Sequence, residues 1–107
     1  MPQSPPSHLS ADVRKWWSYV VSEYQLEAHH VRLLTAACGA WDRANEARRI
    51  LAKEGIIVHD RWGQPKAHPA VAIERDSRIA FARLLRELGL DDGPAELDTR
   101  PPRVGGK

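Results

Sequence analysis

Residues 27–54, EAHHVRLLTAACGAWDRANEARRILAKE, decide the fold of this 107-residue chain. The stretch holds no proline and one interior glycine, Gly39, and it is rich in alanine, leucine, arginine and glutamate, which favour helices. It therefore predicts one helix of about 28 residues and about 42 Å, since an α-helix rises about 1.5 Å per residue. Gly55 follows where a glycine commonly ends a helix, so we expect the helix to stop there.

The apolar residues of this helix form two strips. The first strip is Val31, Leu34, Cys38 and Trp41, and the second is Leu33, Ala37, Ala40, Ala44, Ala47 and Leu51. An apolar arc this wide is broader than one neighbouring helix can cover. We therefore expect the long helix to be central and to pack between two others.

A first helix is predicted from about 11 to 24. Ser10 and Asp12 supply the N-cap oxygen and the first-turn acid that are typical of a helix start. Apolar side chains then recur at steps of three and four residues. Trp16 and Trp17 cannot lie at the same depth because they are adjacent. We expect one of them to anchor the core and the other to cover a neighbouring helix or a partner chain.

The segment after Gly55 predicts a short strand or β-hairpin and then a third helix. Residues 56–58 are β-branched, and glycine and proline follow them, as in a turn. Pro69 suits the first position of a helix that Gly89 closes. The apolar stripe of this helix is Ile73, Ala80, Phe81, Leu84, Leu85 and Leu88.

The predicted fold is thus mainly α. It has a three-helix core with a long central helix, a short strand or β-hairpin before the last helix, and a disordered C-terminal tail. We divide the chain into a flexible N-terminal segment, 1–9, a helical domain, 10–90, and the tail, 91–107, which has almost no apolar residue to bury.

Composition excludes several classes of protein. Hydrophobic residues make up 42% and charged residues 28%, which is typical of a globular domain and not of a disordered chain. The apolar run 33–41 is far shorter than the roughly 20 residues that cross a bilayer, so we expect no membrane span. Residues 1–9 carry no signal-peptide pattern, which predicts a cytoplasmic protein.

No catalytic, metal or cofactor site is expected. His29 and His30 are adjacent, so on a helix they point about 100° apart and cannot easily bind one ion. The sequence has no glycine-rich phosphate loop flanked by a strand and a helix, and no nucleophile in an activating context. We predict neither nucleotide hydrolysis nor a bound cofactor.

Basic side chains gather near the end of the long helix and in the predicted hairpin. They are Arg48, Arg49, Lys53, Arg61 and Lys66. Residues 27–90 hold eleven basic and eight acidic groups, so this part carries the positive excess. The cations predict a phosphate-binding surface whose affinity falls steeply with salt. Solvation of the helix end explains the first three equally well.

Four tryptophans are a high number for so short a chain. They are candidates for contacts between subunits: Trp16, Trp17, Trp41 and Trp62. Trp41 lies on the apolar arc of the long helix, so we also expect it in the core. Trp62 lies in a polar turn where burial within one subunit is awkward. It is therefore expected at a subunit interface or a contact with another partner.

The ordered set of these features resembles the small terminase subunit of tailed phages, specifically the P27 family. The resemblance covers residues 9–90. It is carried by Trp17, Tyr24, Leu26, Leu34, Trp41-Asp42-Arg43, Leu51, Gly55-Ile56-Ile57-Val58, Gly63, His68-Pro69-Ala70 and Arg86-Glu87-Leu88-Gly89-Leu90.

This resemblance implies a non-enzymatic component of genome packaging in the host cytoplasm. Small terminases are helical proteins that form homo-oligomeric rings, recognise viral double-stranded DNA and deliver it to the large terminase subunit, which supplies the ATPase and nuclease. For this chain it implies that domain 10–90 oligomerises and binds DNA. The five cations would contact phosphates, and the tail 91–107 would engage the large subunit.

Two alternatives stay open at this point. One is a small dimeric helical DNA-binding transcriptional regulator with a helix-turn-helix around residues 24–30. Its recognition helix would begin Glu27-Ala28-His29-His30, which offers few of the side chains that read base edges. The other is a small enzyme, which lacks a catalytic constellation.

Overall fold

The structure is a computed structural model that describes residues 3–90. Three helices and one β-hairpin follow in the order α1 (Ala11–Glu23), α2 (Ala28–Glu54), β1 (Ile57–His59), β2 (Pro65–Ala67) and α3 (Pro69–Leu88). This confirms the mainly α fold with a long central helix and a hairpin before the last helix. The predicted tail, 91–107, lies outside the described residues.

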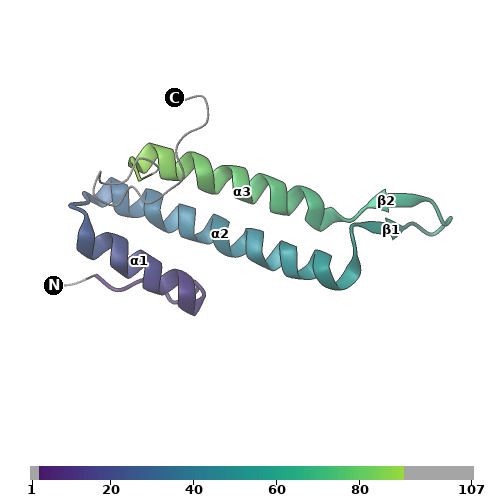
Figure 1. Ribbon diagram of the computed structural model, residues 1–107, viewed down its shortest axis with the longest axis horizontal. Helices are drawn as coiled ribbons and strands as arrows, with labels where there is room; N and C mark the ends of the chain where they lie inside the picture. Colours follow the sequence, from purple (N-terminus) through teal and green to yellow (C-terminus); the bar gives the residue numbers. More distant parts are fainter. Residues whose placement is uncertain (1–2, 91–107) are drawn as a thin grey trace, which may run out of the picture.

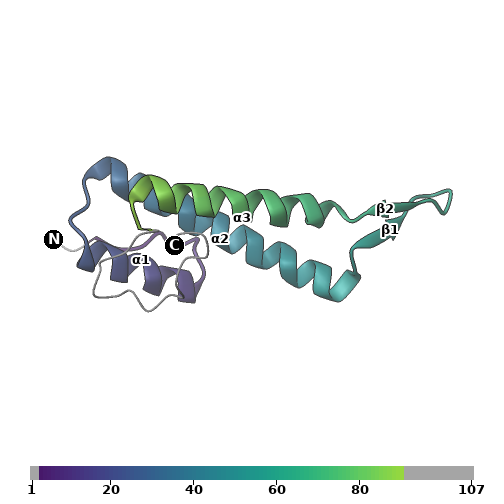
Figure 2. The same ribbon diagram turned by 45° about the horizontal axis from the view of Figure 1, so that its top comes forward.

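Helices α2 and α3 run antiparallel and side by side, and the β-hairpin that connects them projects beyond their ends (Figures 1 and 2). Helix α1 lies against the opposite, N-terminal part of α2 (Figure 1). The described part of the chain is therefore elongated, with α1 at one end and the hairpin at the other.

The ends of α2 follow the local sequence. The side chain of Glu27 and that of His30 form a reciprocal capping box, in which His30 Nδ1 accepts from the Glu27 backbone N–H at 3.1 Å. Gly55 ends the helix with φ +84°, a backbone conformation that residues with a Cβ rarely adopt. The prediction of the helix end at Gly55 is confirmed.

His68 joins the hairpin to α3. As the N-cap of α3 its Nδ1 accepts from the backbone N–H of Ala70 at 3.0 Å, and its Nε2 lies 2.8 Å from Oε1 of Glu54 at the end of α2. Pro69 occupies the first turn, as predicted. One side chain therefore links the last turn of α2 to the first turn of α3.

The β-hairpin is two antiparallel strands with Val58 opposite Lys66. Its tip is held by Asp60, whose Oδ1 accepts from the backbone N–H groups of Trp62 and Gln64 at 2.9 and 3.0 Å. Gly63 takes φ +80° at the turn. The tip is thus a defined turn built around one carboxylate.

The core lies between α1 and the N-terminal half of α2. Its buried side chains are Leu9, Val13, Trp17, Val20, Leu34 and Cys38. Trp17 is 2% exposed and its Nε1–H donates to Thr35 Oγ1 at 3.1 Å. Trp17 is therefore the tryptophan that anchors the core. Leu9 is buried too, so the folded part includes one residue that we had assigned to the flexible segment 1–9.

Small side chains are buried on the side of α2 that faces α3. These are Ala37, Ala40, Ala44 and Ala47 on α2, with Ala70 and Ser77 buried on α3. Short side chains let the two helix backbones approach closely. The predicted burial of α2 on two sides is confirmed.

Two predictions of burial are wrong. Trp41 is 37% exposed, because α1 and α3 flank α2 on different sides and leave the surface between them open. Ile73 of the α3 stripe is 50% exposed. It lies towards the hairpin end of α3, where α1 does not reach (Figure 1).

Candidate functional site

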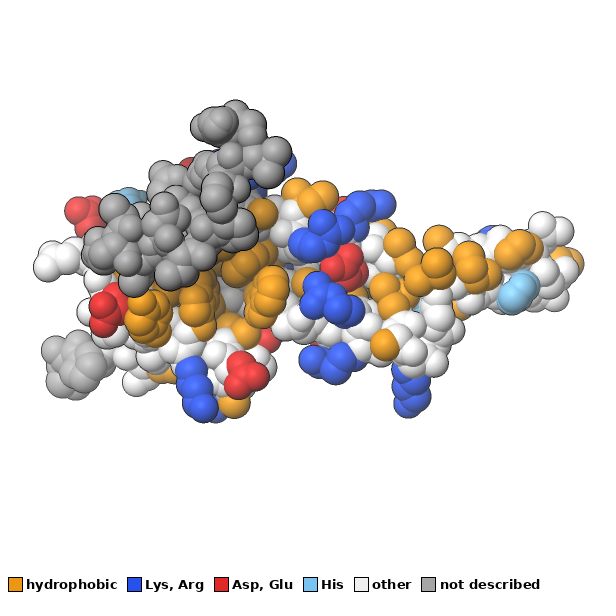
Figure 3. All heavy atoms as spheres, in the orientation of Figure 1, with side chains coloured by type: hydrophobic (Ala, Val, Ile, Leu, Met, Phe, Trp, Pro, Cys, Tyr) orange, Lys and Arg blue, Asp and Glu red, His pale blue; other side chains and the backbone are white. Residues whose placement is uncertain are grey.

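The five predicted cations lie at the hairpin end of the molecule, and all five are exposed. Arg48, Arg49 and Lys53 are on the last two turns of α2, Arg61 is at the hairpin tip, and Lys66 is on β2. Figure 3 shows Lys and Arg side chains gathered over the middle of α2 and α3 on one face. The end of α2 and the hairpin thus carry all five cations, and their role in phosphate binding stays a prediction.

Arg48 is held by an acidic partner on α3. Its Nη2 lies 3.1 Å from Oε2 of Glu74, and Nε of Arg78 lies 3.1 Å from the same oxygen. Hydrogen bonds from Arg78 and then Arg48 lower the pKa of the Glu74 carboxyl below its ordinary value. Arg48 is therefore committed largely to the contact between α2 and α3.

The two hairpin cations have different surroundings. Lys66 Nζ lies 3.7 Å from Oδ2 of Asp60, the carboxylate that shapes the tip. The guanidinium of Arg61 lies over the ring of Trp62, 5.0 Å from its centroid, in a cation–π arrangement. The charge of Lys66 is thus partly neutralised by Asp60, whereas Arg61 and Trp62 form a mixed cationic and aromatic tip.

Arg49 and Lys53 are the two cations in the last two turns of α2 that no acidic side chain of residues 3–90 holds. Neither forms a salt bridge with any of residues 3–90. They are four residues apart and so share one helix face. Arg49 points about 100° away from its neighbour Arg48. The end of α2 therefore presents one cation to α3 and two to the surface.

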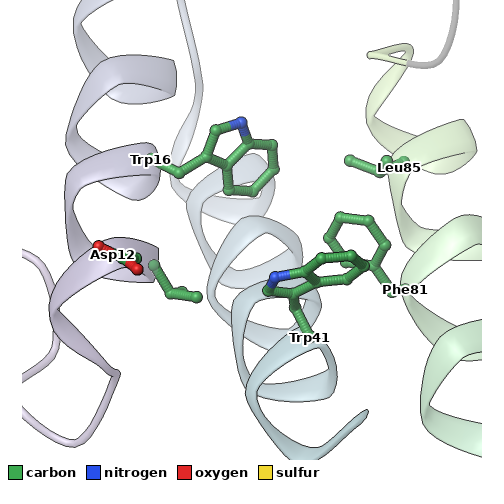
Figure 4. A pocket seen from close by; sticks show the side chains of 6 residues that line it. Asp12, Trp16, Trp41, Phe81 and Leu85 are labelled. Atoms are coloured by element: carbon green, nitrogen blue, oxygen red, sulfur yellow. The ribbon is translucent and has the colours of Figure 1, made fainter. Parts of the chain in front are cut away.

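A groove lined mostly by apolar side chains opens where the three helices meet. Trp16 of α1, Trp41 of α2 and Phe81 of α3 point into it (Figure 4), with Phe81 centroid distances of 6.0 Å to Trp16 and 4.7 Å to Trp41. Asp12, Val13 and Leu85 complete the lining, and the cavity volume is about 390 Å³. Hydrophobic side chains are visible on this part of the surface in Figure 3.

The four tryptophans lie in three different places in the structure. Trp16 and Trp41 line the groove and Trp62 stands at the hairpin tip, 75% exposed. Trp17 is in the core and offers no surface to a partner in this conformation, so its assignment to a subunit interface is corrected. The sequence assigns Phe81 and Leu85 only to the apolar stripe of the third helix and to no functional site. That stripe is the one sequence feature that points to their place in the groove.

Among residues 3–90, no group of three or more His, Cys, Asp and Glu side chains is arranged to hold a metal ion. None of the helices described is long and apolar enough to cross a membrane.

A family model described as "Phage terminase, small subunit" matches residues 14–93, which include α2, the hairpin and α3 and most of α1. The chain belongs to the phage terminase small-subunit family. The match agrees with the resemblance found in the sequence at the level of this family. Comparisons with curated proteins and with solved structures gave no match.

Small terminase subunits are generally non-catalytic, DNA-binding or regulatory proteins. Family membership therefore favours a role in genome packaging over the transcriptional regulator and the small enzyme considered from the sequence. It also gives a context for the two surfaces of this small terminase subunit, the cationic hairpin end and the aromatic groove.

Proposed function

We propose that this small terminase subunit forms a ring-like homo-oligomer in the host cytoplasm. The ring recognises viral double-stranded DNA and recruits or regulates the large subunit at the start of packaging. The observation that carries the proposal is the family match over residues 14–93. The large subunit supplies the ATPase and nuclease, and this chain acts without catalysis or a cofactor of its own.

The hairpin end supports a role in DNA binding. Arg49, Lys53 and Arg61 are exposed cations without a salt bridge in the described part of the chain, and Lys66 adds a fourth exposed cation on β2. A ring repeats such a cationic surface once per subunit, so weak phosphate contacts add through effective concentration. Arg48 contributes less, because Glu74 already holds it.

Domain 10–90 carries both oligomerisation and DNA binding in this proposal, and residues 91–107 engage the large subunit. The oligomer contacts use Trp16, Trp41 and Trp62, which reach the surface. Trp17 supports the subunit core from within.

Charge reversal tests the DNA surface. Binding of a labelled duplex is measured by fluorescence anisotropy across a salt series for R49E/K53E, R61E/K66E and the control K15E, whose charge change lies on α1 at the other end. Removal of phosphate contacts weakens binding and flattens the salt dependence, by about 0.9 in log–log slope for each phosphate that is no longer neutralised. An unchanged affinity and slope in both double variants would clear these residues of the role.

Truncation tests the tail. The large subunit's ATPase is measured with the full chain and with a chain that ends at residue 90. We expect stimulation to fall with the shortened chain while DNA affinity is kept. Undiminished stimulation would remove residues 91–107 from the account.

A further inference from the structure

The hairpin tip offers an exposed aromatic side chain and a cation, and the groove offers aromatic walls and an acidic side chain. Trp62 is the most exposed large hydrophobic side chain of the described residues, at 75%, and Arg61 lies against its ring. The groove has a volume of about 390 Å³, aromatic walls and one acidic residue, Asp12. A cavity of this size is within the range of roughly 300–1,000 Å³ that buries a small organic ligand, and an indole is smaller than such a ligand.

The two features cannot meet within one chain. The groove lies where α1, α2 and α3 come together, and the hairpin projects beyond the opposite end of α2 and α3 (Figures 1 and 4). Trp41, which lines the groove, lies 13 residues before Glu54, the last residue of α2, so the helix alone separates the groove from the base of the hairpin by about 20 Å, and the tip lies farther away. Any occupant of the groove that resembles this tip must therefore come from another molecule.

We propose that the occupant is a second copy of this chain, whose Trp62 inserts between Trp16, Trp41 and Phe81. Tilted aromatic rings at centroid distances of 4.5–7 Å attract one another beyond the area that they bury, and the groove already holds such pairs at 4.7 and 6.0 Å. The incoming indole extends this cluster by one ring and covers the exposed part of Trp41.

Charge complementarity fixes the direction of the insertion. Among residues 3–90, Asp12 is the one charged residue that lines the groove, and it lies at the first turn of α1. Arg61 is adjacent to Trp62 and has no carboxylate partner among residues 3–90. When Trp62 enters the groove, Arg61 pairs with Asp12 of the neighbouring copy. Arg49, Lys53 and Lys66 then remain the principal cations for phosphate.

Such a contact is head-to-tail, because one copy gives its tip and the next gives its groove. Each copy uses both surfaces once, and a head-to-tail contact closes into a ring when its rotation closes. The inference rests on the proposed ring and names the surfaces that build it.

Native mass spectrometry with surface variants tests this contact. The tip variant is W62A and the groove variant is L85E, with I79A as a control that shortens an exposed apolar side chain outside the groove. Circular dichroism verifies that each is helical. Removal of a buried tryptophan anchor is expected to weaken each contact roughly thirtyfold or more, so W62A is expected to be a monomer. L85E places a charge in the apolar lining that receives Trp62 and is also expected to be a monomer, whereas wild type and I79A form rings.

Mixing the two variants provides the decisive observation. A W62A chain keeps its groove and an L85E chain keeps its tip, so an equimolar mixture forms a heterodimer that cannot grow. A ring that persists in W62A, or a mixture of folded variants without heterodimer, would overturn the contact and leave the ring intact. A wild-type chain that stays monomeric with and without DNA would overturn both.

A charge exchange gives a second measurement that does not depend on the fold of L85E. D12R and R61D each weaken assembly, because each places like charges together at the contact. The double variant D12R/R61D restores the pair with its sign reversed and is expected to recover the ring. Double-variant assembly no better than that of either single variant would exclude the Arg61–Asp12 pairing.

Discussion

Ser10 and Asp42 are joined by two hydrogen bonds. The backbone N–H of Ser10 donates to Asp42 Oδ2 at 2.8 Å, and the Ser10 hydroxyl donates to Oδ1 at 2.7 Å. Ser10 is the N-cap of α1 and Asp42 lies midway along α2, so the pair fixes the start of α1 on α2. Asp12 and Trp16 follow within two turns and form the α1 wall of the groove.

Substitution of Asp42 by alanine is expected to loosen α1. The D42A variant lacks both hydrogen bonds and should have a free energy of unfolding lower by about 1–3 kcal/mol. Urea denaturation measures this, with D76A as the control, since Asp76 is exposed and pairs with its sequence neighbour Arg75. Equal stability of D42A and D76A would show that the pair does not fix α1.

The thiol of Cys38 is expected to be unreactive in the folded protein. Burial, and to a lesser extent the charge of Asp42, raise the pKa of Cys38 from the ordinary value of 9.0 to about 12. At pH 8 the thiolate that attacks a disulfide reagent is therefore nearly absent until the core opens. Reaction is followed with an aromatic disulfide in buffer and in urea. A rate in buffer equal to that in urea would contradict the buried position.

The same shift has a consequence at high pH. Folding raises the pKa of Cys38, so the thiol ionises more readily in the unfolded chain. The contribution of the Cys38 thiol to stability is therefore complete below pH 9 and is lost as pH rises towards 12. A C38A variant should lose less stability across this interval than the wild type. The comparison uses the slope of stability against pH, so a constant difference from the smaller side-chain volume does not affect it.

The stabilisation that Glu74 gives to the α2–α3 contact is expected to be lost at acidic pH. Its pKa is lowered in the folded state by hydrogen bonds from Arg78 and Arg48, below the ordinary value of 4.5. The stabilisation is therefore present above that value and is lost as pH falls through the depressed pKa. E74Q should be less stable than wild type at pH 7 and should lose less on acidification. The control is E46Q, and identical acid profiles for E74Q and wild type would contradict the account.

His68 is expected to hold the base of the hairpin. H68A removes the N-cap of α3 and the contact with Glu54, and it should lower stability by about 1 kcal/mol, the typical value of a helix cap. H68N retains a capping oxygen and lacks the Glu54 interaction, so its stability should lie between that of H68A and that of the wild type. Thermal unfolding orders the three proteins. No difference between H68A and wild type would show that neither interaction matters.

Local signals in the sequence predicted the helices well. The bounds of α2 agree with prediction within one residue, because Gly55 stops the helix and no proline interrupts it. The second strand was harder to predict, since Pro65, Lys66 and Ala67 have little β propensity. They pair with β1 because Asp60 organises the turn between them.

The candidate surfaces depend on tertiary placement that no local pattern contains. The apolar arc of α2 predicted two neighbours but not the gap that α1 and α3 leave over Trp41. The spacing of cations could not show that Glu74, 26 residues away, holds Arg48. Trp62 was the exception, because its polar turn already indicated that one subunit could not bury it.

Native mass spectrometry of the purified chain, at micromolar concentration and then with duplex DNA, tests the central claim most directly. The account predicts a discrete complex with one fixed number of identical subunits, larger than a dimer. A monomer or dimer that persists across concentration, and with DNA present, would contradict it.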